Sequence, residues 1–146
     1  LLKATELGAD IVDIELGTKN LDKAVKLIKE KTKCLLSYHD LSNTPSIDSM
    51  KEMVRRQLEA GADICKLVAT ANSFDDNLRV LQIIAALPNE KIVSFAMGPL
   101  GIASRILCPL VGGYFTYASI EEGKASASGQ ITVGELRKIY DMVVRC

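Results

Sequence analysis

The sequence contains the stretch Glu6-Leu-Gly-Ala-Asp-Ile-Val-Asp-Ile-Glu-Leu16 and repeats its pattern at Glu59-Ala-Gly-Ala-Asp-Ile-Cys-Lys-Leu-Val-Ala69. In each copy a helical stretch ends at a glycine, Gly8 or Gly61, because glycine enters the left-handed backbone region at little cost. A short apolar run follows, as is typical of a buried strand. The repeat therefore predicts two copies of a helix–turn–strand unit.

Further predicted strands and helices alternate in the same way along the chain. Residues 34–39, 91–97 and 114–119 are short, apolar and rich in β-branched or aromatic residues, and are predicted as strands. The remaining patterns predict helices. One has Ser46 as its N-cap, with Ser49-x-x-Glu52 as a second option, and the last has Thr132 as its N-cap and Glu135 as the capping-box partner. A first predicted helix ends near residue 7. The other predicted helices cover residues 21–31, 46–60, 74–86 and 133–144.

Alternating strands and helices indicate βαβ units in a parallel α/β sheet. Five units are visible, whereas a closed (β/α)8 TIM barrel needs about 250 residues. The 146 residues therefore form either an open five-stranded sheet or a barrel that lacks its first three βα units. No linker divides residues 1–146, which predicts one domain. The first residue is Leu1 rather than Met, so we expect this sequence to be part of a longer protein.

Composition excludes several classes of function. Apolar residues make up 48% and the formal net charge is zero, so nothing favours nucleic-acid binding. No apolar run approaches the roughly 20 residues that span a membrane. The four cysteines form no C-x-x-C pair and there is one histidine, which argues against a metal site. Cys34 and Cys65 lie in apolar runs and are expected to be buried thiols of a cytoplasmic protein.

Lys66 interrupts an otherwise apolar predicted strand. Burial of an ammonium group is costly, and a lysine that becomes neutral is a nucleophile toward carbonyl carbon. The alternative is a lysine at a strand end whose amine reaches water. His39, the one histidine, ends another predicted strand, where catalytic groups of α/β barrels lie. The alternative interpretation is that His39 has a structural role as a hydrogen-bonded side chain.

Two loops carry the remaining candidates. Met97-Gly-Pro-Leu-Gly101 is a glycine-rich turn after a strand, and Arg105 follows one turn into a helix, which suits an anionic group. An ordinary loop with an exposed arginine is the alternative, and the spacing fits no nucleotide-binding motif. The small residues of 124–130 can bring Ser126 and Gln130 onto a polar ligand.

Taken in order, these segments resemble the type I 3-dehydroquinate dehydratases. The resemblance runs from the first residue to the last helix and is specific as an ordered set. The matching text is Asp13-Ile-Glu-Leu16, Ser37-Tyr-His-Asp40 with Asn43-Thr-Pro45, Asp63-Ile-Cys-Lys66, Met97-Gly-x-x-Gly101-x-x-Ser-Arg105, and Ala125-Ser-Ala-Ser-Gly-Gln130.

The resemblance implies strands four to eight of a TIM barrel and a Schiff-base dehydration of 3-dehydroquinate to 3-dehydroshikimate, with no cofactor. In this family the residue matching Lys66 forms the imine. The residue matching His39 is the general base and acid, and it also assists imine formation and hydrolysis. Arg105 matches the arginine that binds the substrate carboxylate, and Met97 matches a residue that lines the pocket. Ser126 and Gln130 match the loop that closes over the substrate. A homodimer is compatible with this assignment.

The sequence departs from the family in two respects. Ser128 stands where the closing loop usually has proline. The first three strands, which in the family carry hydroxyl-binding arginines and the glutamate that orients the histidine, have no match. Two alternatives stay open: another imine-forming aldolase of TIM-barrel fold that acts on sugar phosphates, and an inactive half-barrel that binds a partner.

Overall fold

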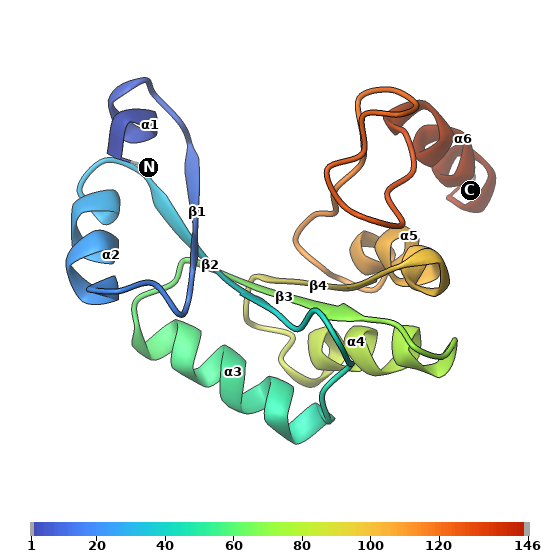
Figure 1. The fold of residues 1–146 in the computed structure, drawn as a ribbon, viewed down its shortest axis with the longest axis horizontal. Helices are drawn as coiled ribbons and strands as arrows, with labels where there is room; N and C mark the ends of the chain where they lie inside the picture. The colour runs from blue at the N-terminus through green and yellow to red at the C-terminus, as the bar shows by residue number, and fades with distance from the viewer. Residues whose placement is uncertain (1, 145–146) are drawn as a thin grey trace.

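The computed structural model describes residues 2–144 and contains a parallel sheet of four strands in the order β1-β2-β3-β4. Helices connect successive strands, as predicted for βαβ units (Figure 1). The strands are β1 (Ile11–Glu15), β2 (Lys33–His39), β3 (Ile64–Thr70) and β4 (Ile92–Met97). The helices are α1 (Leu2–Glu6), α2 (Leu21–Lys29), α3 (Ile47–Glu59), α4 (Asp75–Ala86), η1 (Pro99–Gly101), α5 (Ile102–Leu110) and α6 (Val133–Val143).

The turns and caps predicted from the sequence are present. Gly8 and Gly61 have φ values of +84° and +95° in the turns before β1 and β3. Ser46 caps α3 by accepting a hydrogen bond from the backbone of Ser49, and Thr132 and Glu135 form the predicted capping box of α6. The predicted helix near residue 7 is α1, and Leu1 lies outside the described residues.

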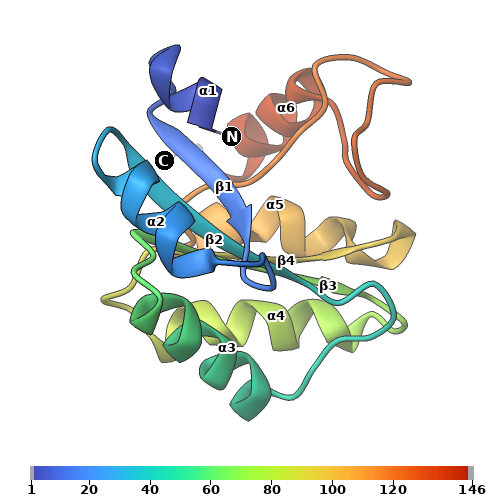
Figure 2. The ribbon, with the colours of Figure 1, turned by 60° about the vertical axis from the view of Figure 1, so that its left-hand side comes forward.

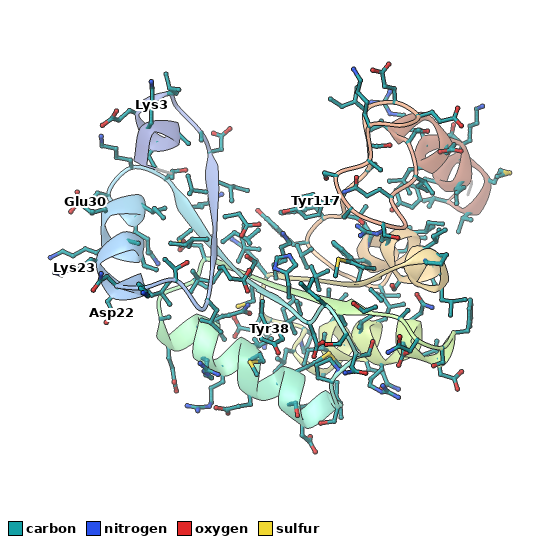
Figure 3. The ribbon with its side chains drawn as sticks, in the orientation of Figure 1. Lys3, Asp22, Lys23, Glu30, Tyr38 and Tyr117 are labelled. Carbon is teal, nitrogen blue, oxygen red and sulfur yellow. The ribbon has the colours of Figure 1, made fainter. Side chains whose placement is uncertain are left out.

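The two faces of the sheet have different neighbours. One face packs against α2, α3 and α4, and its buried residues include Leu36, Cys65 and Leu67. Both views show α3 and α4 side by side beneath the sheet (Figures 1 and 2). The opposite, concave face carries a separate cluster of Leu35, Ile64, Val68, Val93 and Phe95. Figure 3 shows the difference at two labelled tyrosines, since Tyr38 lies toward α3 whereas Tyr117 lies on the concave side.

Gln57 ties the helical layer to the middle of the sheet. This fully buried side chain of α3 donates through Nε2 to the carbonyl oxygens of Leu36 and Lys66, at 3.0 and 2.9 Å. The amide thus fixes the backbone of β3 at the candidate lysine. Replacing it with an apolar residue removes both bonds and leaves the two carbonyl groups to their strand partners alone.

The predicted strand at residues 114–119 is wrong. The amide of Tyr114 donates to Ile92 at the start of β4, but the segment then leaves the sheet, and Ser119 forms only an isolated bridge with Thr132. The rings of Phe115 and Tyr117 instead contact each other edge to face on the concave side of the sheet. The apolar content that suggested a strand therefore serves side-chain packing, and the sheet has four strands rather than five.

The cysteines behave as expected where they are described. Cys34 and Cys65 are buried free thiols, as is Cys108, and burial is the main cause that raises the pKa of Cys34 to about 11 and that of Cys65 to about 12. Cys146 lies outside the described residues. Within residues 2–144 no helix is long and apolar enough to cross a membrane.

Candidate active site

Strand periodicity places the polar residues of three neighbouring strands on the concave face. Side chains two residues apart in a strand share a face, so Asp13 and Glu15 of β1 point the same way. The register pairs Glu15 with Ser37 of β2, and Ser37 with Lys66 of β3, and His39 follows Ser37 by two residues. The parallel register therefore gathers two carboxylates, a hydroxyl, an imidazole and an amine.

A pocket of about 200 Å³ opens on this face. It contains all six residues singled out by the sequence, from three strands, from α5 and from the loop before α6. Its lining is His39, Lys66, Met97, Arg105, Ser126 and Gln130, together with Val68, Phe95, Tyr117 and Ala127.

Lys66 is buried, with 11% of its side chain exposed, so the alternative of an amine reaching bulk water is wrong. Its Nζ donates to Oδ2 of Asp13 at 2.8 Å and lies 4.8 Å from the ring centre of Tyr117. The same amine is therefore both accessible to a ligand in the pocket and held by a charged partner.

His39 has an acidic partner in this chain. Its Nδ1 lies 2.7 Å from Oε2 of Glu15, with about a third of the imidazole exposed. The resemblance implied that the orienting glutamate comes from strands that have no match here. In this structure Glu15, from the first strand, contacts the ring instead, and this contact leaves Nε2 as the nitrogen available to a ligand.

Arg105 is 2% exposed and its guanidinium stacks 4.3 Å from the ring centre of Phe95. Nη2 donates to the carbonyl oxygen of Ser128 at 3.3 Å, and Nε has no hydrogen-bond partner within residues 2–144. Burial lowers the pKa of Arg105 to about 10. A buried guanidinium with an unused donor is suited to a carboxylate ligand, and the alternative of an exposed arginine is wrong.

The loop of residues 124–130 lies over Gly98. Ser126 and Gln130 bond to each other, since the Ser126 amide donates to Oε1 of Gln130 at 2.9 Å and Nε2 of Gln130 donates back to the Ser126 hydroxyl at 3.1 Å. Gly129 has φ +79°, and a Cβ there would lie 2.4 Å from the carbonyl oxygen of Gly98. Glycine is therefore required for the loop to approach this closely.

The serine at position 128 keeps the contacts of the loop. Its carbonyl oxygen accepts from the amide of Gly98 and from Arg105, both at 3.3 Å. Proline also supplies a carbonyl oxygen, so the departure from the family pattern leaves both bonds intact. The side chain of Ser128 itself is exposed.

Four polar residues around the pocket received no role from the sequence: Asp13, Glu15, Ser37 and Tyr117. The available signal was the pair of acidic residues two positions apart in the otherwise apolar β1. Strand alternation places such a pair on one face, and that face proves to be the concave one. Among residues 2–144 no group of His, Cys, Asp or Glu side chains is arranged to hold a metal ion.

Comparison with known proteins gives one family. The sequence pattern described as Type I 3-dehydroquinase matches residues 1–145. A 3-dehydroquinate dehydratase of Dehalococcoides mccartyi is 46% identical over 143 residues, which cover 98% of this chain and 64% of that protein. A 3-dehydroquinate dehydratase of Methanocaldococcus jannaschii is 40% identical over 144 residues, covering 97% of this chain and 64% of that protein.

Solved structures agree with the sequence comparison. The type I 3-dehydroquinate dehydratase of Clostridium difficile, with covalently modified comenic acid, superposes with a TM-score of 0.86 at 25% identity over 97% of this chain and 58% of that one. The 3-dehydroquinate dehydratase of Aquifex aeolicus superposes with a TM-score of 0.82 at 31% identity, over 99% of this chain and 65% of that one. The fold thus matches part of a TIM-barrel enzyme, and the chain spans about 64% of the length of the curated relatives cited above. With these matches and the ordered motifs, the chain belongs to the type I 3-dehydroquinase family.

Proposed function

We propose that this chain carries the imine-forming lysine, the acid–base histidine and the carboxylate-binding arginine of a type I 3-dehydroquinate dehydratase. The reaction removes water from 3-dehydroquinate to give 3-dehydroshikimate. One observation carries the proposal: a buried amine, an imidazole and a buried guanidinium line the same pocket, at Lys66, His39 and Arg105.

Binding begins with the substrate carboxylate. Arg105 offers donors that its protein neighbours leave unused, and a guanidinium pairs bidentately with a carboxylate. Met97 and Phe95 supply apolar contacts to the ring. Ser126 and Gln130, which bond to each other in this structure, turn their donors and acceptors to substrate hydroxyls when the loop closes.

Chemistry follows at the ketone. Lys66 condenses with the C3 carbonyl, water leaves, and the resulting imine withdraws electrons from C2. His39 removes the C2 proton and later gives a proton to the departing C1 hydroxyl, since an imidazole serves as base and acid near neutral pH. Hydrolysis of the product imine then frees Lys66. The C. difficile structure with covalently modified comenic acid supports a covalent route in this family.

We further propose that the four strands correspond to strands four to seven of a TIM barrel, with residues 114–119 in the place of the eighth. Three upstream βα units complete the barrel and add the remaining substrate contacts. Two facts support this assignment: the curated relatives are longer, and the concave face bearing the pocket is the face that a barrel encloses.

The decisive experiment is reductive trapping. The complete protein, with the upstream βα units of its barrel, is incubated with 3-dehydroquinate and borohydride, and the modified residue is located by peptide mass spectrometry. We expect an adduct on Lys66 that is absent from Lys66→Ala, while Lys91→Ala, which changes an exposed lysine outside the pocket, is trapped normally.

The alternatives give other outcomes. An adduct with sugar phosphates but not with 3-dehydroquinate indicates an aldolase. No adduct with either class of ligand, in a chain whose circular dichroism shows it to be folded, favours an inactive binding module and overturns the proposal.

A further inference from the structure

Asn77 is a buried polar residue of α4 whose side chain makes three hydrogen bonds, although it does not line the pocket. Nδ2 donates to the carbonyl oxygens of Phe74 at 2.9 Å and Leu100 at 2.7 Å. Oδ1 accepts from the backbone amide of Ser104 at 2.9 Å. Both amide protons and the oxygen of this side chain are therefore used, and two of the three bonds reach the segment that leads to Arg105.

The bond to Ser104 replaces a missing helix cap. The first amides of a helix have no partner within the helix, and a side chain at the N-cap usually accepts from the second or third of them. The N-cap of α5 is Gly101, which has no side chain, and Ser104 is the third residue of this helix. A Cβ at Gly101 would lie 2.5 Å from the carbonyl oxygen of Ala96, so no residue with a capping side chain fits there. Asn77 therefore caps α5 from a neighbouring helix.

Ser104 in turn joins α5 to β4. Its side chain is fully buried, and its hydroxyl oxygen accepts from the amide of Ala96 at 2.9 Å. Phe95 precedes Ala96 and Arg105 follows Ser104, so this bond brings the guanidinium beside the ring on which it stacks. Ser104 thus fixes the first turn of α5 against β4, directly before the arginine.

The position of Arg105 depends strongly on this turn. Within residues 2–144 its guanidinium makes one hydrogen bond, from Nη2 to the carbonyl oxygen of Ser128 at 3.3 Å, and Nε has no partner. A side chain with so few polar contacts is placed mainly by its backbone and by its packing on Phe95. A shift of the first turn of α5 would therefore move the donors that a carboxylate needs, and a misplacement of about 1 Å can cost about a hundredfold in rate.

We infer that Asn77 is a positioning residue for substrate recognition: by capping α5 it sets where Arg105 presents its guanidinium to the substrate carboxylate. The inference rests on the proposed function, because it gives Asn77 a part in the task proposed for Arg105. Asn77 itself contacts neither the substrate nor the reacting atoms. Since Arg105 moves with α5 whereas Lys66 belongs to β3, the cap fixes the spacing between the carboxylate and the ketone that the pocket accepts.

The test is a steady-state assay of 3-dehydroshikimate formation by the complete protein, with the upstream βα units of its barrel. Asn77→Val removes the polar atoms of the side chain and fills much of the same space. We expect KM for 3-dehydroquinate to rise about tenfold while kcat stays within about twofold, because carboxylate binding acts on the substrate and the transition state alike. A loss of folded protein alone would instead lower kcat and leave KM unchanged.

A double-mutant cycle shows whether Asn77 acts through Arg105. Arg105→Ala is expected to raise KM by more than Asn77→Val does. Adding Asn77→Val to Arg105→Ala should then raise KM by less than about twofold more, since the group that Asn77 positions is gone. An effect of Asn77→Val that is as large without the guanidinium as with it overturns the inference.

Ser94→Ala is the matched control. Ser94 is buried in β4, and its hydroxyl donates to the carbonyl oxygen of Val80 in α4 at 2.7 Å, so this variant also removes a buried side-chain hydrogen bond of α4, but not the cap of α5. It is expected to lose stability and to keep both kcat and KM. If Asn77→Val does not fold, Asn77→Ser, whose side chain is smaller and polar, takes its place with the same expectations.

The outcomes separate this inference from the proposed function. If the unmodified protein forms no 3-dehydroshikimate, the proposed function fails and takes the inference with it. If the unmodified protein is active and Arg105→Ala raises KM, but Asn77→Val leaves KM unchanged, only the inference fails. The inference also fails if Ser94→Ala raises KM as much as Asn77→Val does, because any loosening of α4 would then have the same effect.

Discussion

Oε2 of Glu15 lies 2.7 Å from Nδ1 of His39, so the first strand of this chain orients the imidazole at the end of the second. The two residues are not register partners, since Glu15 pairs with Ser37, and the contact runs diagonally along the strands. An acidic partner on one nitrogen fixes the ring and leaves the other nitrogen free for proton transfer.

Glu15→Gln is expected to lower the rate of 3-dehydroshikimate formation about fivefold in the complete enzyme. Both side chains are partly exposed, so the contact that holds the imidazole contributes only about 1 kcal/mol, which corresponds to about fivefold in rate. The control is Glu52→Gln, which removes an exposed partner of Arg55 on α3. An unchanged rate of product formation would show that His39 needs no partner from β1.

Gly129→Ala is expected to displace the loop that carries Ser126 and Gln130. A Cβ at this position would lie 2.4 Å from a backbone oxygen, and the φ of +79° adds about 1–2 kcal/mol of strain. We expect weaker binding of 3-dehydroquinate, measured by isothermal titration. Gly123→Ala is the matched control, since Gly123 has φ +76° in the same loop region but nothing within 4 Å of an added Cβ. Equal affinities for the two variants would mean that strain, rather than the approach to Gly98, governs the loop.

Arg105→Lys is expected to weaken binding of 3-dehydroquinate by about tenfold to a hundredfold. An ammonium cannot pair bidentately with a carboxylate, and a charged hydrogen bond contributes about 1.5–3 kcal/mol. The measurement is the dissociation constant from titration calorimetry. Arg55→Lys, on the exposed surface of α3, serves as the control. Retained affinity in Arg105→Lys would place the substrate carboxylate elsewhere in the pocket.

Local patterns predicted most of the fold. Gly8 and Gly61 marked two turns because the left-handed backbone is a property of single residues, and the capping box at Thr132 depends on residues three apart. The segment at residues 114–119 was predicted wrongly as a strand. Its composition is that of a strand, but pairing depends on neighbours elsewhere in the chain, which a local pattern does not contain.

The pocket could be predicted only in part for the same reason. Lys66 was identified because a charge in an apolar strand is unusual, and His39 because it ends a strand. The partners of these two residues, Asp13 and Glu15, depend on the register between β1, β2 and β3, which sets which side chains meet. Family resemblance supplied the candidate roles, whereas the contacts required the three-dimensional structure.

Asp76 stabilises the start of α4 in a pH-dependent manner. Its buried carboxylate accepts from the amides of Asn72 and Ser73 at 2.9 Å and pairs with Arg79. Burial alone would raise the pKa of this carboxyl, but the bonds from Ser73 and Asn72 and the charge of Arg79 outweigh it and lower the pKa. The ionised form therefore stabilises the fold above the unfolded-state pKa of about 3.9, and this stabilisation is lost as the pH falls through the lower folded-state pKa.

Asp76→Asn is expected to reduce the free energy of unfolding by about 1–2 kcal/mol at pH 7, because an amide accepts these hydrogen bonds more weakly and does not pair with Arg79. The difference from the unmodified chain should shrink as the pH falls below about 4, where the carboxyl is protonated first in the unfolded chain and, at lower pH, in the folded chain. Urea unfolding at pH 7 and pH 3 measures both values. Asp75→Asn, an exposed neighbour in the same turn, should change stability by less than about 0.5 kcal/mol. A deficit of the same size at both pH values would mean that the shape of the side chain, rather than its charge, stabilises this helix start.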